Sequence, residues 1–440
     1  MKLSVAGLWH LGSVTAACLA SAGHDVTGFD VDGDVVRRLQ TDGQPPIFEP
    51  GLRELVDSGR REGRLRFSSD PRDAVRQSDV VWIAWDTPVD RDDRADVEAV
   101  IEHAVRLFPN LSPGTLVLVS SQLPVGSVRR LEQECLRARP GVPGVDVAGI
   151  SFGCVPENLR LGQAIERFLN PDRVVVGVRQ PEDRARVTAL FAPFTHKLEW
   201  MSIESAEMTK HALNAFLATS VAFANEIGML CERVGADASE VARGLKTDVR
   251  IGPKAYLDPG GAFAGGTLAR DLMFLSALGD ERQTPVTLLS SVYISNELHR
   301  GWPTRRLEQL FGDMAGRRIA VWGLTYKPGT DTLRGSHAVA LCERLTAAGA
   351  NVAAHDPAVA ALPADIRGHC RLSASALDAA READAIVVAT EWPEYRQIGA
   401  DAVMSHVGGP RVSVLDANRF LKDTLSADPR IQYLTVGSPA

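Results

Sequence analysis

The first thirty residues alternate between short apolar runs and a helical pattern, and few folds can accommodate this order. Leu3 to Leu8 is short and apolar, Ser13 to Ala22 has a helical pattern that Gly23 ends, and His24 to Asp30 is apolar again. Two parallel strands need a crossover of this kind between them. The pattern therefore predicts a βαβ unit at the start of a mostly parallel sheet.

Apolar strand patterns and helical patterns continue to alternate along the rest of the chain. The stretch from Ser205 to Val234 is one helical pattern without proline, long enough to connect two domains. We therefore expect an α/β protein with two Rossmann-like, doubly wound parallel-sheet domains, joined by a central helical domain with a long helix. The expected bounds are 1–200, 201–305 and 315–440. Further strands are predicted at Val80–Trp85, Leu116–Ser120, Val147–Phe152, Arg173–Val178, Arg317–Leu324, Asn351–Asp356, Ala385–Thr390 and Arg411–Asp416, and a helix at Leu333–Ala348.

Composition narrows the class of protein. The 440 residues are 45% hydrophobic and 23% charged, as in a soluble globular protein. We expect no window of about 18 apolar residues that could span a bilayer, and no signal peptide before the first strand, hence a cytoplasmic protein. A net charge of −7 without a long basic run argues against nucleic-acid binding.

The six cysteines are scattered. Their spacing suits neither a zinc site nor a disulfide framework, so no metal site is predicted and buried thiols are expected. They are Cys18, Cys135, Cys154, Cys231, Cys342 and Cys370.

The turn after the first strand predicts a dinucleotide site. Gly7 allows a tight turn, Gly12 allows the helix to pack closely on the strand, and the helix start offers N–H groups to a pyrophosphate. Asp30, 18 residues after Gly12, can accept from a ribose 2′-hydroxyl and would repel a 2′-phosphate, so NAD is expected. Trp9 replaces the usual middle glycine; the alternative is a plain turn that binds no nucleotide.

On the long helix, Lys210 and Asn214 lie four residues apart, hence on one face. Further motifs follow one another along nearly the whole chain: Glu49–Leu52, Thr87–Pro88, Leu123–Gly126, Pro156–Arg160, Asn170–Arg173, Ala206–Phe216, Asn225–Glu226, Asp248–Gly252, Gly323–Arg334 and Thr390–Pro393. Together these segments resemble the UDP-glucose/GDP-mannose dehydrogenase family.

The resemblance implies a set of roles. It implies NAD in the first domain, a nucleotide sugar (most simply a UDP-sugar) between the central and last domains, oxidation at the sugar alcohol, and a homodimer through the central helix. The implied catalytic residues are Lys210, Asn214, Asp271 and Glu157. Cofactor binding is implied for Gly7, Trp9, His10, Leu11, Gly12, Asp30, Thr87, Pro88 and Gln122. Substrate binding is implied for Asn158, Leu159, Arg160, Arg250, Gly265, Gly266, Thr267, Leu268, Lys327 and Arg334.

One segment departs from the family pattern. Where such proteins usually read Gly-Gly-Ser-Cys, then an apolar residue, proline, lysine and aspartate, this chain has the shorter run Gly265 to Asp271, without cysteine. The family's second oxidation passes through a thiohemiacetal and a thioester on that cysteine. Gln122 and Leu161 also replace residues usual for the hydrolysis step.

These differences lead to one main expectation and three alternatives. We expect one hydride transfer to NAD, giving an aldehyde or ketone. The alternatives are redox-neutral epimerisation or dehydration in which NAD returns the hydride, complete oxidation to a uronate by a cysteine-independent route, and a catalytically silent nucleotide-sugar-binding protein. No partner other than substrate and a second copy is expected.

Overall fold

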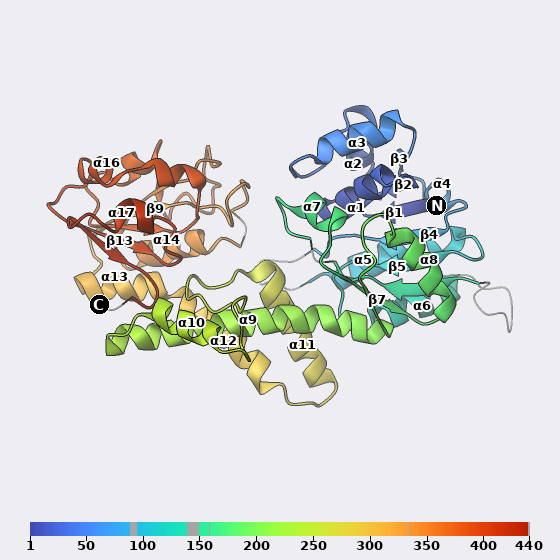
Figure 1. The fold of residues 1–440 in the computed structure, drawn as a ribbon. Coiled ribbons are helices and arrows are strands. Elements are labelled where there is room, and N and C mark those ends of the chain that lie inside the picture. Colours follow the sequence, from blue (N-terminus) through green and yellow to red (C-terminus); the bar gives the residue numbers. More distant parts are fainter. Residues whose placement is uncertain (89–94, 139–148, 158, 334, 439–440) are drawn as a thin grey trace. The chain divides into compact units, whose positions relative to one another are not determined.

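The computed structural model describes residues 1–88, 95–138, 149–157, 159–333 and 335–438. The chain divides into two compact units, Met1–Ala212 and Leu213–Ala440. Each unit contains a sheet of Rossmann type, and the second also contains a group of helices (Figure 1). The predicted α/β class with two Rossmann-like domains and a helical region is confirmed. The three-domain bounds stay a prediction.

The first unit is built on an eight-stranded sheet in the described part of the chain, with strand order β3-β2-β1-β4-β5-β6-β7-β8. The sequence pattern did not predict β3 or β8. The pairing is parallel except between β6 and β7. The strands are β1 (Lys2–Ala6), β2 (Asp25–Phe29), β3 (Leu65–Ser68), β4 (Val80–Ile83), β5 (Leu116–Val119), β6 (Ser151–Cys154), β7 (Val174–Val178) and β8 (Leu198–Met201).

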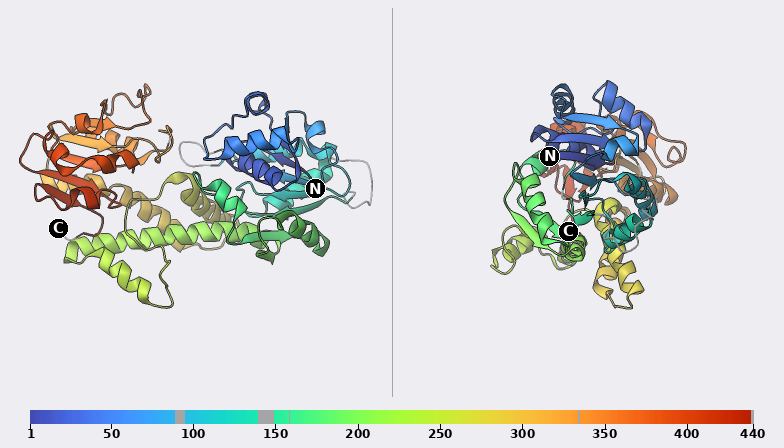
Figure 2. Two further views of the ribbon diagram at one scale, coloured as in Figure 1. Left: turned by 45° about the horizontal axis from the view of Figure 1, so that its top comes forward. Right: turned by 90° about the vertical axis from the view of Figure 1, so that its right-hand side faces the viewer.

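Helices cover both faces of this sheet (Figure 2). Alternate strand residues face opposite ways, so Val80 and Trp82 belong to one apolar cluster while Val81 and Ile83 belong to the other. The helices are α1 (His10–Ser21), α2 (Gly33–Thr41), α3 (Leu52–Arg61), α4 (Pro71–Val75), α5 (Val97–Val105), η1 (Phe108–Asn110), α6 (Ser127–Ala138), α7 (Ala164–Leu169) and α8 (Pro181–Phe191). The continuous apolar strands predicted this double burial.

The long predicted helix exists. It is α9 (Ile203–Val234), which begins in the first unit and continues into the second. The expectation that no window of about 18 residues is apolar enough to cross a bilayer was wrong, because α9 passes that test with a mean hydropathy of 1.2. Of that window, 39% is buried in the protein, and a core helix of a soluble protein passes the same test.

The second unit combines helices with a smaller sheet. Every described strand pair in this sheet is parallel, in the order β11-β10-β9-β12-β13-β14. The strands are β9 (Arg318–Trp322), β10 (Asn351–His355), β11 (Arg371–Leu372), β12 (Ala385–Val388), β13 (Val412–Asp416) and β14 (Ile431–Leu434). The helices are α10 (Ala238–Thr247), η2 (Gly265–Ala269), α11 (Arg270–Glu281), α12 (Thr287–Arg300), α13 (Trp302–Phe311), α14 (His337–Ala347), α15 (Ala376–Ala379), η3 (Pro393–Gln397), α16 (Ala400–Met404) and α17 (Lys422–Leu425).

Candidate functional site

The glycine turn of the first unit has the shape that a dinucleotide requires. Gly7 has φ +97°, and a Cβ there would lie 2.5 Å from the backbone nitrogen of Trp85. A Cβ at Gly12 would lie 1.5 Å from the carbonyl oxygen of Gly7. Both outer glycines are therefore sterically required by the approach of α1 to β1. The first turn of α1, which includes Leu11, presents N–H groups without helical acceptors.

Trp9 does not obstruct this turn. Its backbone has φ −78°, a value that any L-residue adopts, and it precedes α1 as the N-cap residue. Trp9 as a residue is 49% exposed, so it is not packed inside the turn. The φ angle at the middle position therefore does not require glycine in this chain.

Asp30, the residue predicted to bind a ribose, contacts the glycine turn directly. The carboxylate follows β2 and accepts the N–H of Leu8 at 2.6 Å through Oδ2 and that of Asp32 at 3.0 Å through Oδ1. Each carboxylate oxygen has two acceptor sites, so capacity for a ribose hydroxyl remains. Asp30 therefore also organises the glycine turn, a role that the sequence pattern did not predict.

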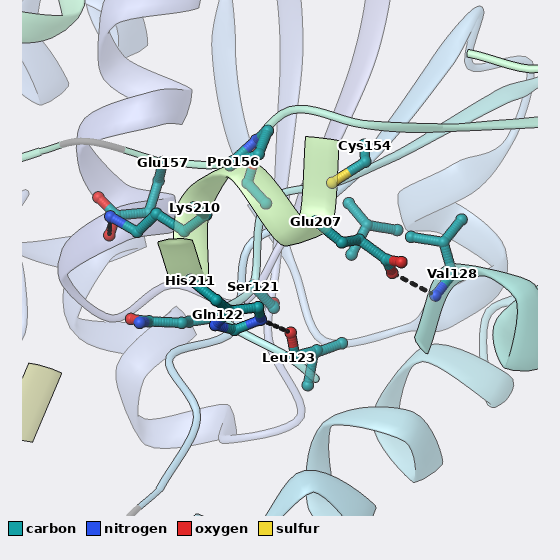
Figure 3. Close-up of a pocket in the computed structure, with 12 residues that line it drawn as sticks. Ser121, Gln122, Leu123, Val128, Cys154, Pro156, Glu157, Glu207, Lys210 and His211 are labelled. Atoms are coloured by element: carbon teal, nitrogen blue, oxygen red, sulfur yellow. Dashed lines mark hydrogen bonds and ion pairs between the residues drawn. The ribbon is translucent and has the colours of Figure 1, made fainter. Parts of the chain in front are cut away.

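A small pocket in the first unit gathers several of the predicted residues. Lys210, from α9, points to Glu157, which follows β6, with Nζ 3.6 Å from Oε1 (Figure 3). The two side chains are only 11% and 21% exposed. Gln122 lines the same pocket, and its carbonyl oxygen accepts the Thr87 hydroxyl at 2.7 Å. Lys210, Glu157 and Gln122 are therefore brought together.

Two neighbours of Lys210 on α9 fix the loop after β5. Glu207 accepts the N–H of Gly126 at 2.7 Å and that of Val128 at 2.9 Å, and so caps the start of α6. His211 donates from Nε2 to the carbonyl oxygen of Leu123 at 2.9 Å (Figure 3). Burial raises the pKa of Glu207. These contacts hold the Gln122 loop against the helix that carries Lys210.

Glu49 is a further positioning residue that sequence reasoning named only as part of a motif. Its buried carboxylate lies 2.9 Å from Nε2 of His10 and accepts the N–H groups of Gly162 at 2.8 Å and Ala164 at 2.9 Å. It thereby joins the first residue of α1 to the start of α7. The Glu-Pro-Gly-Leu run was the available signal, but its target cannot be read from spacing.

Asn214 and Asp271 meet in the second unit. Nδ2 of Asn214, on α9, donates to Oδ2 of Asp271, on α11, at 2.5 Å. Both side chains are buried, and Asp271 is fully so. The segment before Asp271 forms the π-helical turn η2, in which Leu268 packs against the apolar cluster between α9, α11 and α12. Gly266 lies close to Tyr326, since a Cβ there would be 3.2 Å from its hydroxyl.

Lys327 lines a larger pocket of the second unit, with a volume of about 270 Å³. His337, Trp302 and Glu391 also line it. Arg250 is not among its lining residues: its guanidinium is 85% exposed and pairs with Asp248 at 2.7 Å. The predicted phosphate-binding arginine is thus not gathered with Lys327.

The remaining predicted site residues are more scattered. Leu159 donates its N–H to Glu157 at 2.7 Å, while Arg160 and Pro88 are exposed. Asn158 and Arg334 lie outside the described residues. Among the described residues no group of three or more His, Cys, Asp or Glu side chains could hold a metal ion.

Comparison with known proteins explains this arrangement. Residues 1–195 match the NAD binding domain of the UDP-glucose/GDP-mannose dehydrogenase family, 204–298 its central domain and 320–423 its UDP binding domain. The chain is 37% identical to the UDP-glucose 6-dehydrogenase of Rhizobium meliloti over the full length of both. It is 33% identical to UDP-glucose 6-dehydrogenase TuaD of Bacillus subtilis over all of this chain and 94% of the relative.

Solved structures of nucleotide-sugar dehydrogenases resemble this chain over nearly its whole length. A UDP-glucose dehydrogenase from Pyrobaculum islandicum shares 28% identity and superposes with a TM-score of 0.84, covering 99% of this chain and 98% of the other. A UDP-D-ManNAc dehydrogenase from Pyrococcus horikoshii, 22% identical with 99% of each chain covered and a TM-score of 0.85, shares the fold. With its NAD-binding turn and three matched domains, the chain belongs to the UDP-glucose/GDP-mannose dehydrogenase family and is an NAD-dependent oxidoreductase of the nucleotide-sugar dehydrogenase type.

Proposed function

We propose that this protein oxidises an alcohol of a UDP-sugar once and releases the carbonyl product. The alcohol carbon gives a hydride to NAD⁺ and its hydroxyl gives a proton, so that one carbonyl, one NADH and one H⁺ result. The UDP part is supported by the family's UDP binding domain, which matches residues 320–423, and by relatives named UDP-glucose 6-dehydrogenase. Lys327 and the pocket that it lines supply a cationic site for a diphosphate.

The observation that carries this proposal is the absence of an available thiol. The run Gly265 to Asp271 contains no cysteine, and all six cysteines of the chain are buried. A second oxidation of an aldehyde by hydride transfer needs a tetrahedral adduct, which a thiolate normally supplies. Leu268 cannot supply one, and its side chain packs in an apolar cluster.

Cys154 is the one cysteine among the described lining residues of the Lys210 pocket, so it is the natural candidate for a replacement. It lies on the Glu207 side of this pocket, whereas Lys210 faces Glu157 (Figure 3). Burial raises the pKa of the Cys154 thiol well above its usual range, and the Glu207 carboxylate raises it further. Because the thiolate is the nucleophile, Cys154 is poorly suited to the second oxidation.

In contrast, the chain retains the residues that the first oxidation requires. The ammonium of Lys210 is held by Glu157 in a nearly buried position, where a positive charge stabilises a developing alkoxide. Asn214 is oriented by Asp271, since its amide nitrogen donates to that carboxylate and its amide oxygen is thereby fixed in direction. Such buried, oriented polar groups are expected in an enzyme and have no evident use in a silent binding protein.

The test is the number of NADH molecules formed per sugar. Purified protein is incubated with excess NAD⁺ and a limiting amount of UDP-glucose, then of other UDP- and GDP-sugars, while absorbance at 340 nm and product mass are recorded. We expect one NADH per sugar and a product two mass units lighter. Two NADH with an acid product would contradict the proposal. Retained NAD without net NADH would indicate redox-neutral chemistry, and binding without any exchange of deuterium at the sugar carbon would indicate a silent protein.

A Leu268→Cys variant is the matched control for the missing nucleophile. The loop remains one residue shorter than the family pattern, and the new side chain starts from a position that packs against apolar residues. We therefore expect this variant still to form one NADH per sugar. Formation of the uronate by Leu268→Cys would show that the loop length does not limit the second step.

We also propose that two copies of the chain pair through α9. Phe216, Phe223 and Leu230 are 70%, 46% and 61% exposed and recur every seven residues, so they form one apolar stripe on the helix. Such stripes on protein surfaces commonly mark interfaces between chains. The exposed Arg250 fits this proposal, because the family resemblance implies that this arginine acts across a dimer interface.

Replacement of Phe216 and Phe223 together by glutamate should convert the dimer into a monomer, because like charges would face each other across a two-fold axis. Sedimentation velocity or light scattering measures the mass. Leu136→Glu is the control, since Leu136 is 52% exposed on α6 of the first unit. A wild-type chain that is monomeric at micromolar concentration, or a double variant that still dimerises, would refute the interface.

A further inference from the structure

The carboxylate of Glu49 is buried between the glycine turn of the first unit and the start of α7. The side chain is only 1% exposed. Nε2 of His10 lies 2.9 Å from Oε2, and the N–H groups of Gly162 and Ala164 donate to Oε2 at 2.8 Å and to Oε1 at 2.9 Å. A buried carboxylate is tolerated only when polar partners satisfy it. Glu49 therefore depends on partners from two separate elements.

On one side, Glu49 caps the start of α7. The first N–H groups of a helix have no acceptor within the helix, and a side chain at the N-cap position commonly supplies one. Gln163, the described N-cap residue of α7, makes no hydrogen bond of this kind with its side chain. Glu49 supplies the acceptor from a distant part of the chain. The position of α7 therefore depends on the Glu49 carboxylate.

The segment that leads into α7 begins at Glu157. The N–H of Leu159 donates to Oε2 of Glu157 at 2.7 Å, and the N–H of Gln163 donates to the carbonyl oxygen of Arg160 at 2.9 Å. The side chain of Leu159 also packs against the apolar cluster that contains residues of α1. Oε1 of Glu157 lies 3.6 Å from Nζ of Lys210. A shift at the start of α7 would therefore move the Glu157 carboxylate relative to Lys210.

On the other side, His10 belongs to the turn that binds NAD. It is the first residue of α1, and the initial N–H groups of such a helix are those that a pyrophosphate meets. Asp30 holds the opposite flank of the turn, because it accepts the N–H of Leu8 at 2.6 Å. Asp30 and Glu49 thus hold the turn from two sides, and Glu49 does so through the His10 imidazole.

One oxygen of Glu49 serves both sides. Oε2 contacts the His10 imidazole and also accepts the N–H of Gly162, so a movement of this oxygen toward one partner changes its bond to the other. We propose that Glu49 is a positioning residue that couples NAD binding to the loop of Glu157. NAD holds the turn and His10 in place, and His10 holds the Glu49 carboxylate. This carboxylate in turn holds the start of α7 and the segment that carries Glu157.

The coupling acts in both directions, because two linked sites change each other's binding equilibrium by the same factor. Bound NAD should therefore protect the segment before α7, and loss of the link should weaken NAD binding. In Glu49→Gln, the amide brings a donor to a place where backbone N–H groups already point, so one of them loses its acceptor. We expect this variant to raise the Kd of NAD about tenfold, which calorimetry measures.

The test is hydrogen–deuterium exchange of the full-length protein with and without NAD, read in peptides that cover residues 159–169. In the wild type, saturating NAD should slow exchange of this segment about fivefold. His10→Phe removes the contact with the turn but leaves Glu49 bonded to α7, so NAD should no longer slow exchange there. His10→Gln keeps a donor and should restore the response. Glu54→Gln, at an exposed residue of α3, should behave as the wild type.

Each variant is measured at an NAD concentration well above its own Kd, so that weak binding is not mistaken for lost coupling. An equal effect of NAD on the wild type and on His10→Phe would overturn the proposal, since Glu49 would then only cap α7. A wild-type segment that NAD leaves unchanged would overturn it as well. The exchange measurement uses NAD alone, so its result is independent of which alcohol is oxidised and of how many hydrides are transferred.

The effect on turnover rests on the proposed function, because it concerns the pair of Glu157 and Lys210. With a sugar nucleotide that gives turnover, Glu49→Gln should lower kcat even at saturating NAD, since Glu157 would no longer be held beside Lys210. A variant that only weakened the cofactor site would raise the KM for NAD and leave kcat unchanged. That second result would contradict the coupling to Glu157, whatever product is formed.

Discussion

A Lys210→Ala variant is expected to retain the fold and to lose about 10²- to 10³-fold in kcat. The ammonium lies 3.6 Å from Oε1 of Glu157 and is only 11% exposed, so its charge is little screened by water. A developing alkoxide at this position would lose its nearest cation, while the carboxylate of Glu157 would stay behind and repel it. The measurement is steady-state NADH production with the sugar nucleotide that gives turnover.

Two controls identify the source of the loss. Lys246→Ala removes a lysine that pairs with Asp258 at 2.6 Å on the surface of the second unit, and it should change kcat by less than twofold. Glu157→Gln keeps the shape of the partner but removes its charge. If Lys210→Ala keeps kcat within tenfold of wild type while its circular dichroism and melting temperature are unchanged, Lys210 does not act on the alkoxide.

The sequence predicted the parts of the fold that depend on local pattern. Apolar runs predicted the central strands of both sheets, because a strand that is buried on both faces is apolar along its whole length. The edge strands of both sheets, β3, β8, β11 and β14, were not predicted. β8, for example, is only partly buried and contains both apolar and polar residues. The antiparallel pairing of β6 with β7 was missed for another reason, as strand direction depends on the connection and not on composition.

The candidate site was less predictable because local sequence patterns do not encode contacts between residues far apart in the chain. The glycines around Trp9 and the carboxylate of Asp30 were found because their spacing is fixed within one βαβ unit. Glu49 and Glu207 act on backbone N–H groups far away in sequence, and no local pattern encodes such partners. The helix α9 passes the test for a membrane span by its length and composition alone.

An Asp271→Ala variant is expected to lose both activity and stability. Asp271 is fully buried and accepts the Nδ2–H of Asn214 at 2.5 Å. Removing the carboxylate leaves a buried amide with an unmet donor, which costs about 1–3 kcal/mol of unfolding free energy. The freed Asn214 can rotate, so its oxygen no longer points in one direction, and kcat should fall by about 10²-fold.

The isosteric Asp271→Asn variant separates the two effects. It fills the same volume and can still accept from Asn214, so urea denaturation should show most of the lost stability restored, while kcat stays low because the negative charge is gone. Asp280→Ala, an exposed carboxylate on the same helix α11, should change neither quantity. An Asp271→Asn variant with wild-type kcat would show that this carboxylate only supports packing.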